Sequence, residues 1–232
     1  MLHRYFRSLV HLFFPELCMG CNNSLVEQEE MVCTACLFHL PKTDFHMDCN
    51  NDSVQLLKGK FQFKFACSML YLSSGSLVER LIYHLKYNNH PQVGYYFGRL
   101  YGKDLLDSPF MEKIDLVVPI PLHRKRLNKR GYNQSEYFAK GLAKSLGSKV
   151  DSKTLIRRTY QSSQTKLLTF ERFLNVEDAF QCIDPEKFGN MNILLVDDVL
   201  TTGSTIASAA NELNKSAPSC KIYIASLARA KI

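Results

Sequence analysis

Two adjacent acids, Asp197 and Asp198, directly follow a short apolar run at 193–196, and small hydroxyl residues come soon after them. The apolar run is typical of a buried parallel strand, and a helical pattern begins near residue 205. In an open α/β sheet, ligands bind where such a strand ends and the next helix starts. Carboxylates accept hydrogen bonds from vicinal hydroxyls, whereas they repel phosphate. We therefore interpret the two acids as ribose-binding residues.

The hydroxyl loop, residues 201–205, carries the groups that bind a phosphate. Hydroxyls and backbone N–H groups can surround the anion, a glycine allows close approach, and the following helix start adds partial positive charge. The predicted 5-phosphate ligands are Thr201, Thr202, Gly203, Ser204 and Thr205. The alternative is an acidic turn that only caps a helix. The whole pattern instead favours a sugar with a 5-phosphate over that turn and over a bare triphosphate.

A second anion site is predicted after the apolar strand at 115–121, which its prolines terminate. A basic loop follows and leads into a helix at 133–146, for which Asn133 or Ser135 can be the N-cap. The basic cluster consists of Arg124, Lys125, Arg126, Lys129 and Arg130. Anion sites at neighbouring strand ends match a ligand with a phosphate at both ends. The alternative is a solvated basic loop.

The strand, acids and hydroxyl loop resemble the ribose-phosphate signature of type I phosphoribosyltransferases. The wider chain resembles the ComF family of competence-associated proteins. That resemblance extends over the N-terminal cysteines, VPIPLHRKRLNKRGYNQSE at 118–136 and RRTYQSSQTKLLTFERFLNV at 157–176. Together these stretches run across most of the chain.

The resemblance implies a ligand and a site for each motif. The acids would bind the ribose of phosphoribosyl pyrophosphate (PRPP), the hydroxyl loop its 5-phosphate, and the basic loop its pyrophosphate, which Mg²⁺ accompanies. Lys86 ends a predicted helix at 76–87 and would face the same site, although it could equally be a solvated lysine. A mobile lid is expected in the polar stretch that follows residue 156. Its predicted residues are Arg157, Arg158, Gln164 and Arg172.

Four cysteines near the N-terminus have the spacing of a metal site. Cys18, Cys21, Cys33 and Cys36 form two CxxC pairs separated by eleven residues. Two such pairs can close a tetrahedron around a structural Zn²⁺, and a segment this small needs a staple to fold. Two disulfides or four unrelated buried thiols are the alternatives. With four protein ligands, no catalysis is expected at the metal.

Composition sets the broad class. The 232 residues carry a formal charge of +7, which suits phosphate-bearing ligands, and no apolar run is long enough for a membrane span. The basic, apolar start is predicted to be an amphipathic helix and not an export signal, so a cytoplasmic protein without membrane insertion is expected. We expect an N-terminal helix and zinc module at 1–55. A type I phosphoribosyltransferase-like domain, an α/β parallel sheet flanked by helices, is expected at 56–232.

Three functions remain open from the sequence. The ComF resemblance implies PRPP binding and the handling of single-stranded DNA during natural transformation, with a competence helicase or uptake-channel protein as partner. A second hypothesis is an active phosphoribosyltransferase acting on a nitrogen base. Thr201 weakens it, because purine enzymes often place an acid there, and no catalytic residue is assigned. The third is a PRPP or nucleotide sensor without turnover.

Overall fold

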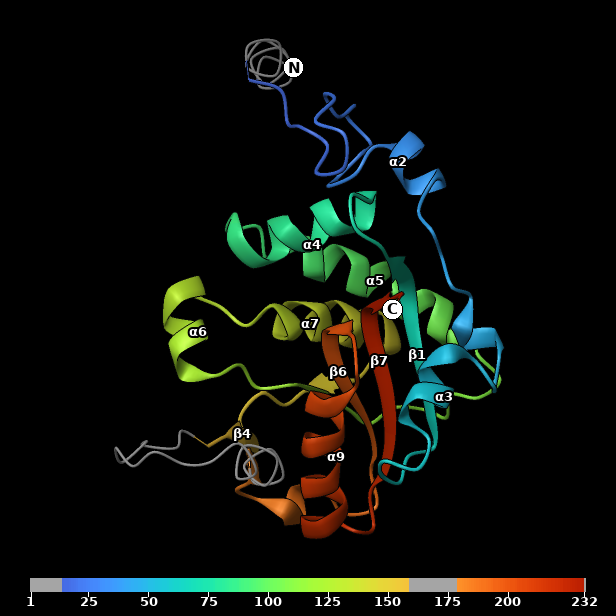
Figure 1. The fold of residues 1–232 in the computed structure, drawn as a ribbon, viewed down its shortest axis with the longest axis vertical. Helices are drawn as coiled ribbons and strands as arrows, with labels where there is room; N and C mark the ends of the chain where they lie inside the picture. Colours follow the sequence, from blue (N-terminus) through green and yellow to red (C-terminus); the bar gives the residue numbers. More distant parts are fainter. Residues whose placement is uncertain (1–13, 159–178, 232) are drawn as a thin grey trace.

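The computed structural model describes residues 14–158 and 179–231, which are built around a five-stranded sheet (Figure 1). The strand order is β1-β7-β6-β2-β3, and every pairing in this sheet is parallel. The strands are β1 (Phe65–Leu72), β2 (Leu116–Pro119), β3 (Lys149–Val150), β6 (Asn192–Leu200) and β7 (Lys221–Ala230). The predicted α/β class with a parallel sheet flanked by helices is confirmed.

Helices cover both faces of the sheet, which explains the continuous apolar run in β6. Leu194 and Val196 belong to one core cluster, whereas Ile193 and Leu195 belong to the cluster on the opposite face. The helices of the first face are α4 (Leu77–Tyr87), α5 (Gln92–Leu106) and α7 (Gln134–Leu146); those of the second are α3 (Asp52–Leu57) and α9 (Ser204–Ser216).

Glycines bring α5 and α7 unusually close together. A Cβ atom on Gly141 would lie 2.2 Å from the backbone oxygen of Tyr95, and one on Gly98 would lie 2.3 Å from that of Phe138. Real Cβ atoms do not approach backbone this closely, so glycine is needed at both positions. This contact sets the position of α7, whose first turn reaches the carboxyl end of β6.

Two local predictions were wrong. The strand was expected to end before the acids, but β6 continues to Leu200, because Asp197 pairs in register with Ser226 of β7. The basic cluster was expected in a loop, but it forms a short helix, α6 (Arg124–Arg130). Arginine and lysine are good helix formers. His123 caps the N-terminus by accepting from the Lys125 amide, and Gly131, at φ 78°, ends the helix.

The remaining elements are short. They are α2 (Thr34–Phe38), η1 (Phe45–Met47), η2 (Pro185–Phe188) and the antiparallel pair β4 (Leu155–Arg157) and β5 (Phe180–Cys182). The cysteine segment lies against α4, where Arg80 Nε donates to the Gly20 carbonyl at 2.8 Å. The division at residue 55 stays a proposal. Most of the expected N-terminal helix, residues 1–13, lies outside the described residues.

None of the helices in the described part of the chain combines the length and the apolar character that crossing a bilayer requires.

Candidate functional site

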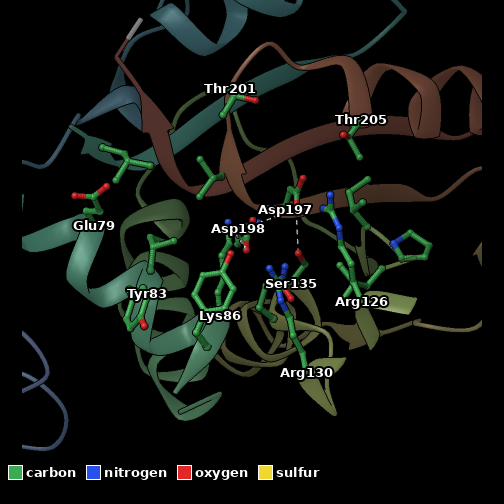
Figure 2. A pocket seen from close by; sticks show the side chains of 18 of the residues that line it. Glu79, Tyr83, Lys86, Arg126, Arg130, Ser135, Asp197, Asp198, Thr201 and Thr205 are labelled. Carbon is green, nitrogen blue, oxygen red and sulfur yellow. Dashed lines mark hydrogen bonds and ion pairs between the residues drawn. The ribbon is translucent and has the colours of Figure 1, made fainter. Parts of the chain in front are cut away.

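A cavity of about 470 Å³ lies at the carboxyl ends of β6 and β2, and we call it the sheet-edge cavity (Figure 2). Side chains from α4, α6, α7 and β4 also line it, so residues far apart in sequence meet there. Of the predicted site residues it includes Lys86, Arg126, Arg130, Arg157, Asp197, Asp198, Thr201 and Thr205. The carboxyl edge of the sheet is where an α/β fold binds its ligands.

Asp197 is held by two hydrogen bonds. Its Oδ1 accepts from Ser135 Oγ at 2.9 Å and from the Asp198 amide at 2.9 Å. Burial, and next the adjacent charge of Asp198, raise the pKa of Asp197, while the two hydrogen bonds and Lys86 lower it in part. The net effect is a raised pKa, so this carboxyl holds its proton more tightly than an exposed acid.

Asp198 is buried and faces a cation. Lys86 Nζ, from the end of α4, lies 3.2 Å from Asp198 Oδ2, while that oxygen accepts no hydrogen bond within the described residues. The sequence left open whether Lys86 was a solvated lysine, and its position against Asp198 argues against that alternative. Gln134 Oε1, at the same cavity, is also buried without a donor in the described structure. Buried acceptors without partners are uncommon and call for an explanation.

The hydroxyl loop follows β6 directly. Gly203 has φ 77°, which residues with a side chain rarely adopt, and a Cβ there would lie 2.5 Å from Leu57. Two cations hold the backbone carbonyls of the loop: Lys60 Nζ donates to Thr202 at 2.7 Å, and Arg229 Nη1 donates to Thr201 at 3.1 Å. A small recess of about 20 Å³ lies against the loop, and its lining includes Thr201, Gly203, Ser204 and Thr205. Thr202 does not line it; its hydroxyl lies 2.9 Å from that of Ser204.

Only one face of α6 reaches the cavity. Arg126 and Arg130 are four residues apart and line it, whereas Arg124 and Lys125 do not. Arg157 of β4 lines the same cavity as these two arginines of α6, and burial, and next the charge of Arg126, lower its pKa. A second cavity of about 540 Å³, the α6 cavity, adjoins it. Its lining residues are Lys86, Tyr87, Asn89, Arg126, Lys129, Arg130 and Tyr132.

The expected lid is described only in part. Arg157 belongs to β4 and lines the sheet-edge cavity, while Arg158 follows β4 and hydrogen-bonds Gln181 at 3.3 Å. Gln164 and Arg172 lie outside the described residues. The lid therefore stays a prediction.

The four predicted cysteine ligands come together. The Sγ atoms of Cys18, Cys21, Cys33 and Cys36 all lie within 4.8 Å of one another, and those of Cys21 and Cys33 are 3.7 Å apart. Around a zinc ion with Zn–S bonds of about 2.3 Å, tetrahedral geometry separates sulfurs by about 3.8 Å. The backbone amides of Gly20 and Cys33 donate to Cys18 Sγ at 3.3 and 3.2 Å. Such donors stabilise a thiolate, so the cluster fits a zinc module.

Comparison with known proteins supports a family assignment through individual relatives. No family model matches it. DNA utilization protein YhgH of Salmonella typhimurium is 32% identical over 136 residues, covering 57% of this chain but only 59% of that protein. YhgH of Escherichia coli O157:H7 is 28% identical over 200 residues, covering 85% and 83%. Competence protein ComFC of Bacillus subtilis is 35% identical over 104 residues, covering 44% and 39%. These relatives support an assignment of the chain to the ComF family.

Solved structures resemble the chain only distantly. A glutamine PRPP amidotransferase from B. subtilis has a TM-score of 0.41 at 19% identity and covers 61% of this chain and 30% of that one. An adenine phosphoribosyltransferase from Leishmania tarentolae has a TM-score of 0.38 at 13% identity, covering 82% and 94%. Similarity this weak carries no argument about ligand or chemistry, which must come from the residues themselves.

Several residues that line the cavity were not predicted as site residues, among them Glu79, Tyr83, Tyr87, Gln134 and Ser135. The N-cap of α7 was expected at Asn133 or Ser135; Asn133 caps the helix, and Ser135 instead donates to Asp197. Gln134 precedes Ser135 in the same turn, and both follow the basic cluster that the sequence marks as an anion site. Tyr83 and Tyr87 are four residues apart and so share one face of the predicted helix, and Lys86 is three residues from Tyr83. Helical periodicity could therefore have placed the two tyrosines beside Lys86.

We predict that Asp197→Asn removes a pH-dependent loss of stability. Because folding raises the pKa of Asp197 from 3.8 to about 7, the native chain binds this proton more tightly than the unfolded chain. Its stabilising effect is therefore present at low pH and is lost as the pH rises through that interval. Asparagine keeps an acceptor for Ser135 without the titration. The free energy of unfolding should thus fall less in the variant between about pH 4 and pH 7.

Chemical denaturation at a series of pH values measures this difference. Glu186→Gln, which changes an exposed acid of η2, is the matched control and should follow the parent profile. Parallel profiles for the parent and Asp197→Asn would show that Asp197 has no raised pKa.

Proposed function

We propose that this chain binds a phosphoribosyl ligand, for which PRPP is the best match, and takes part in handling single-stranded DNA during natural transformation. The observation that carries the first part is the charge pattern of the sheet-edge cavity. Buried acceptors occupy its centre, hydroxyls one side and arginines another. The cytoplasm is the expected compartment, and a competence helicase or uptake-channel protein is the expected protein partner.

The centre of the cavity suits the ribose. Gln134 Oε1 has no hydrogen-bond donor in the described structure, Asp198 Oδ2 has only its ion pair with Lys86, and Asp197 lies beside them. An unsatisfied buried acceptor costs about 1–3 kcal/mol, which a bound hydroxyl can offset. Vicinal hydroxyls supply two donors at adjacent positions. A bare polyphosphate would supply none and would be repelled by the acids.

The sides of the cavity suit phosphates. Thr201 and Thr205 offer hydroxyls at the loop, where the 5-phosphate would bind, and Arg126, Arg130 and Arg157 would bind the pyrophosphate. Mg²⁺ would be carried by the pyrophosphate oxygens and would reduce their charge. The mixture of acids and arginines in the lining fits such a cation-bearing ligand better than a free anion.

We predict that the double substitution Arg126→Ala/Arg130→Ala weakens binding of PRPP with Mg²⁺ about ten-fold or more, because charge-assisted hydrogen bonds contribute roughly 1.5–3 kcal/mol each. The matched control is Arg124→Ala/Lys125→Ala, which removes the same charge from the same helix at positions that do not line the cavity. Its affinity should stay within about two-fold of the parent.

Titration calorimetry makes both measurements. Equal losses of PRPP affinity in the two double variants would show that the effect comes from overall charge and not from residues that line the cavity. If the parent bound neither PRPP nor ribose 5-phosphate, the phosphoribosyl proposal would be wrong.

The same complex separates the two alternative functions. An active phosphoribosyltransferase releases pyrophosphate when PRPP and a suitable base are both present, whereas a sensor binds PRPP without release. Arginines placed at the leaving pyrophosphate would stabilise its developing charge in the enzyme. Following pyrophosphate release with a panel of bases distinguishes the two.

The α6 cavity supports the DNA part of the proposal. Four of its lining residues, Lys86, Arg126, Lys129 and Arg130, are cationic; none of the lining residues is acidic, and Tyr87 and Tyr132 are aromatic. Proteins that bind single strands combine a positive groove with rings on which bases stack. The relatives named for DNA utilization and competence add to this support.

We predict that Lys129→Ala weakens binding of a short single-stranded oligonucleotide and lowers the salt dependence of that binding by about one unit of slope. PRPP affinity should not change, because Lys129 lines the α6 cavity but not the sheet-edge cavity. Lys144→Ala, which removes an exposed lysine of α7, is the control. Mobility shifts across a salt series would count against the proposal if both lysine variants behaved alike.

The cysteine module is proposed to bind a structural Zn²⁺. Its four sulfurs lie within 4.8 Å of one another, one pair is 3.7 Å apart as in tetrahedral coordination, and two amides already donate to Cys18. Four protein ligands leave no position for a substrate, so the ion would supply folding free energy only.

We predict about one zinc per chain in the purified protein, and its loss on Cys18→Ser, because an alcohol replaces a thiolate ligand. Cys49→Ser is the matched control, since Cys49 is exposed and stands outside the cluster. Elemental analysis of both variants provides the measurement. Zinc retained at parent level in Cys18→Ser, or absent from the parent, would contradict the assignment.

A further inference from the structure

The sheet-edge cavity has one wall that neither phosphate nor ribose explains. Tyr83 and Tyr87 lie one turn apart on α4 and both line the cavity. We propose that this tyrosine wall is a subsite for a neutral nitrogen heterocycle that carries an amine. The inference rests on the proposed phosphoribosyl function and names the base that would accompany the sugar.

The two rings form a stacking surface. Their centroids are 5.2 Å apart at an interplanar angle of 43°, and the residues are 54% and 59% exposed. Arg130 adds a cation over the Tyr87 ring at 5.2 Å from its centroid. Exposed neighbouring rings at a cavity are suited to stack a planar group, and the guanidinium strengthens such a platform.

The floor beside this wall is apolar. Leu72, Ile82 and Val199 come from β1, α4 and β6 and line the same cavity. Phosphate would lose hydration against such a floor without gaining partners. A flat heterocycle would instead bury apolar surface there, so the wall and the floor select the same kind of group.

The order of groups across the cavity matches a nucleotide. Figure 2 shows Glu79 and Tyr83 on one side, Arg126 on the other, and the two acids between them. Phosphates are attracted toward the arginines and the hydroxyl loop, and the sugar toward the acids. The opposite side, at Tyr83, is then left for an uncharged ring.

Glu79 selects against a ring that carries negative charge. It lines the cavity on the tyrosine side, and its Oε2 accepts from the Gly75 amide at 2.6 Å. The lysine nearest the wall in sequence, Lys86, is paired with Asp198. A carboxylate at this position favours a base whose edge donates from an amine and disfavours a base that carries its own carboxylate.

Calorimetry with AMP and ribose 5-phosphate on the full, zinc-loaded chain tests the subsite. AMP should bind about ten-fold or more tightly than ribose 5-phosphate, which is the effect of stacking one base on an aromatic side chain. In Tyr83→Ala/Tyr87→Ala, AMP affinity should fall to the level of ribose 5-phosphate, while ribose 5-phosphate binding stays within about two-fold of the parent. Tyr83→Phe/Tyr87→Phe keeps the rings and should keep most of the difference.

A second pair of ligands tests Glu79. Uridine 5-phosphate should bind more tightly than orotidine 5-phosphate, whose base carries a carboxylate, and Glu79→Gln should narrow that gap. The glutamine keeps an oxygen that can accept from Gly75, so the helix start is preserved.

The outcomes separate this inference from the proposal beneath it. If ribose 5-phosphate binds but AMP binds no more tightly, the subsite is overturned and the phosphoribosyl proposal stands. Equal weakening of both ligands by the tyrosine substitutions also overturns it, because the rings would then only support the fold. A parent that binds neither ligand overturns both.

Discussion

Two adjacent carboxylates in the last part of a central strand, three residues or fewer before its carboxyl end, impose the main physical constraint on this protein. Asp198 is buried and Asp197 is partly so, and their mutual repulsion makes both ionised forms unfavourable unless positive charge or donors lie nearby. Lys86 at 3.2 Å and Ser135 at 2.9 Å meet that need. These partners come from α4 and α7, so the close glycine packing of α7 against α5 bears directly on the charge state of the site.

These partners satisfy the acids only in part. The hydrogen-bonding capacity that is left unused defines the chemistry of the cavity. Asp198 Oδ2 and Gln134 Oε1 keep unused acceptor capacity, while the surrounding arginines keep unused donors. A ligand that carries hydroxyls in the middle and anionic groups at its ends complements both. Charge separation of this kind selects a ligand by the order of its groups as well as by its total charge.

Lys86, Tyr87, Arg126 and Arg130 line both the sheet-edge cavity and the α6 cavity. An anion bound in one cavity therefore changes the positive charge available to the other. The cysteine module also contacts α4, through Arg80 and the Gly20 carbonyl. Helix α4, which carries Lys86 and the tyrosine wall, thus contacts the acids at one end and the cysteine module at the other. It links the two cavities to the module.

The chemistry of the central motif could be predicted from the sequence, because it depends on residues that are neighbours along the chain. The apolar strand, the acids, the glycine of the hydroxyl loop and the paired cysteines all specify local geometry through spacing and residue type. The role of Ser135 could not, since its partner Asp197 is 62 residues away and only packing brings them together. The sequence also could not predict which basic residues reach the cavity, because that depends on the helical phase of α6. Arg126 and Arg130 line the cavity, whereas Arg124 and Lys125 do not. Local sequence thus determined which groups are present, whereas tertiary packing decided which of them share one cavity, because side-chain direction is set only when helices are fixed against the sheet.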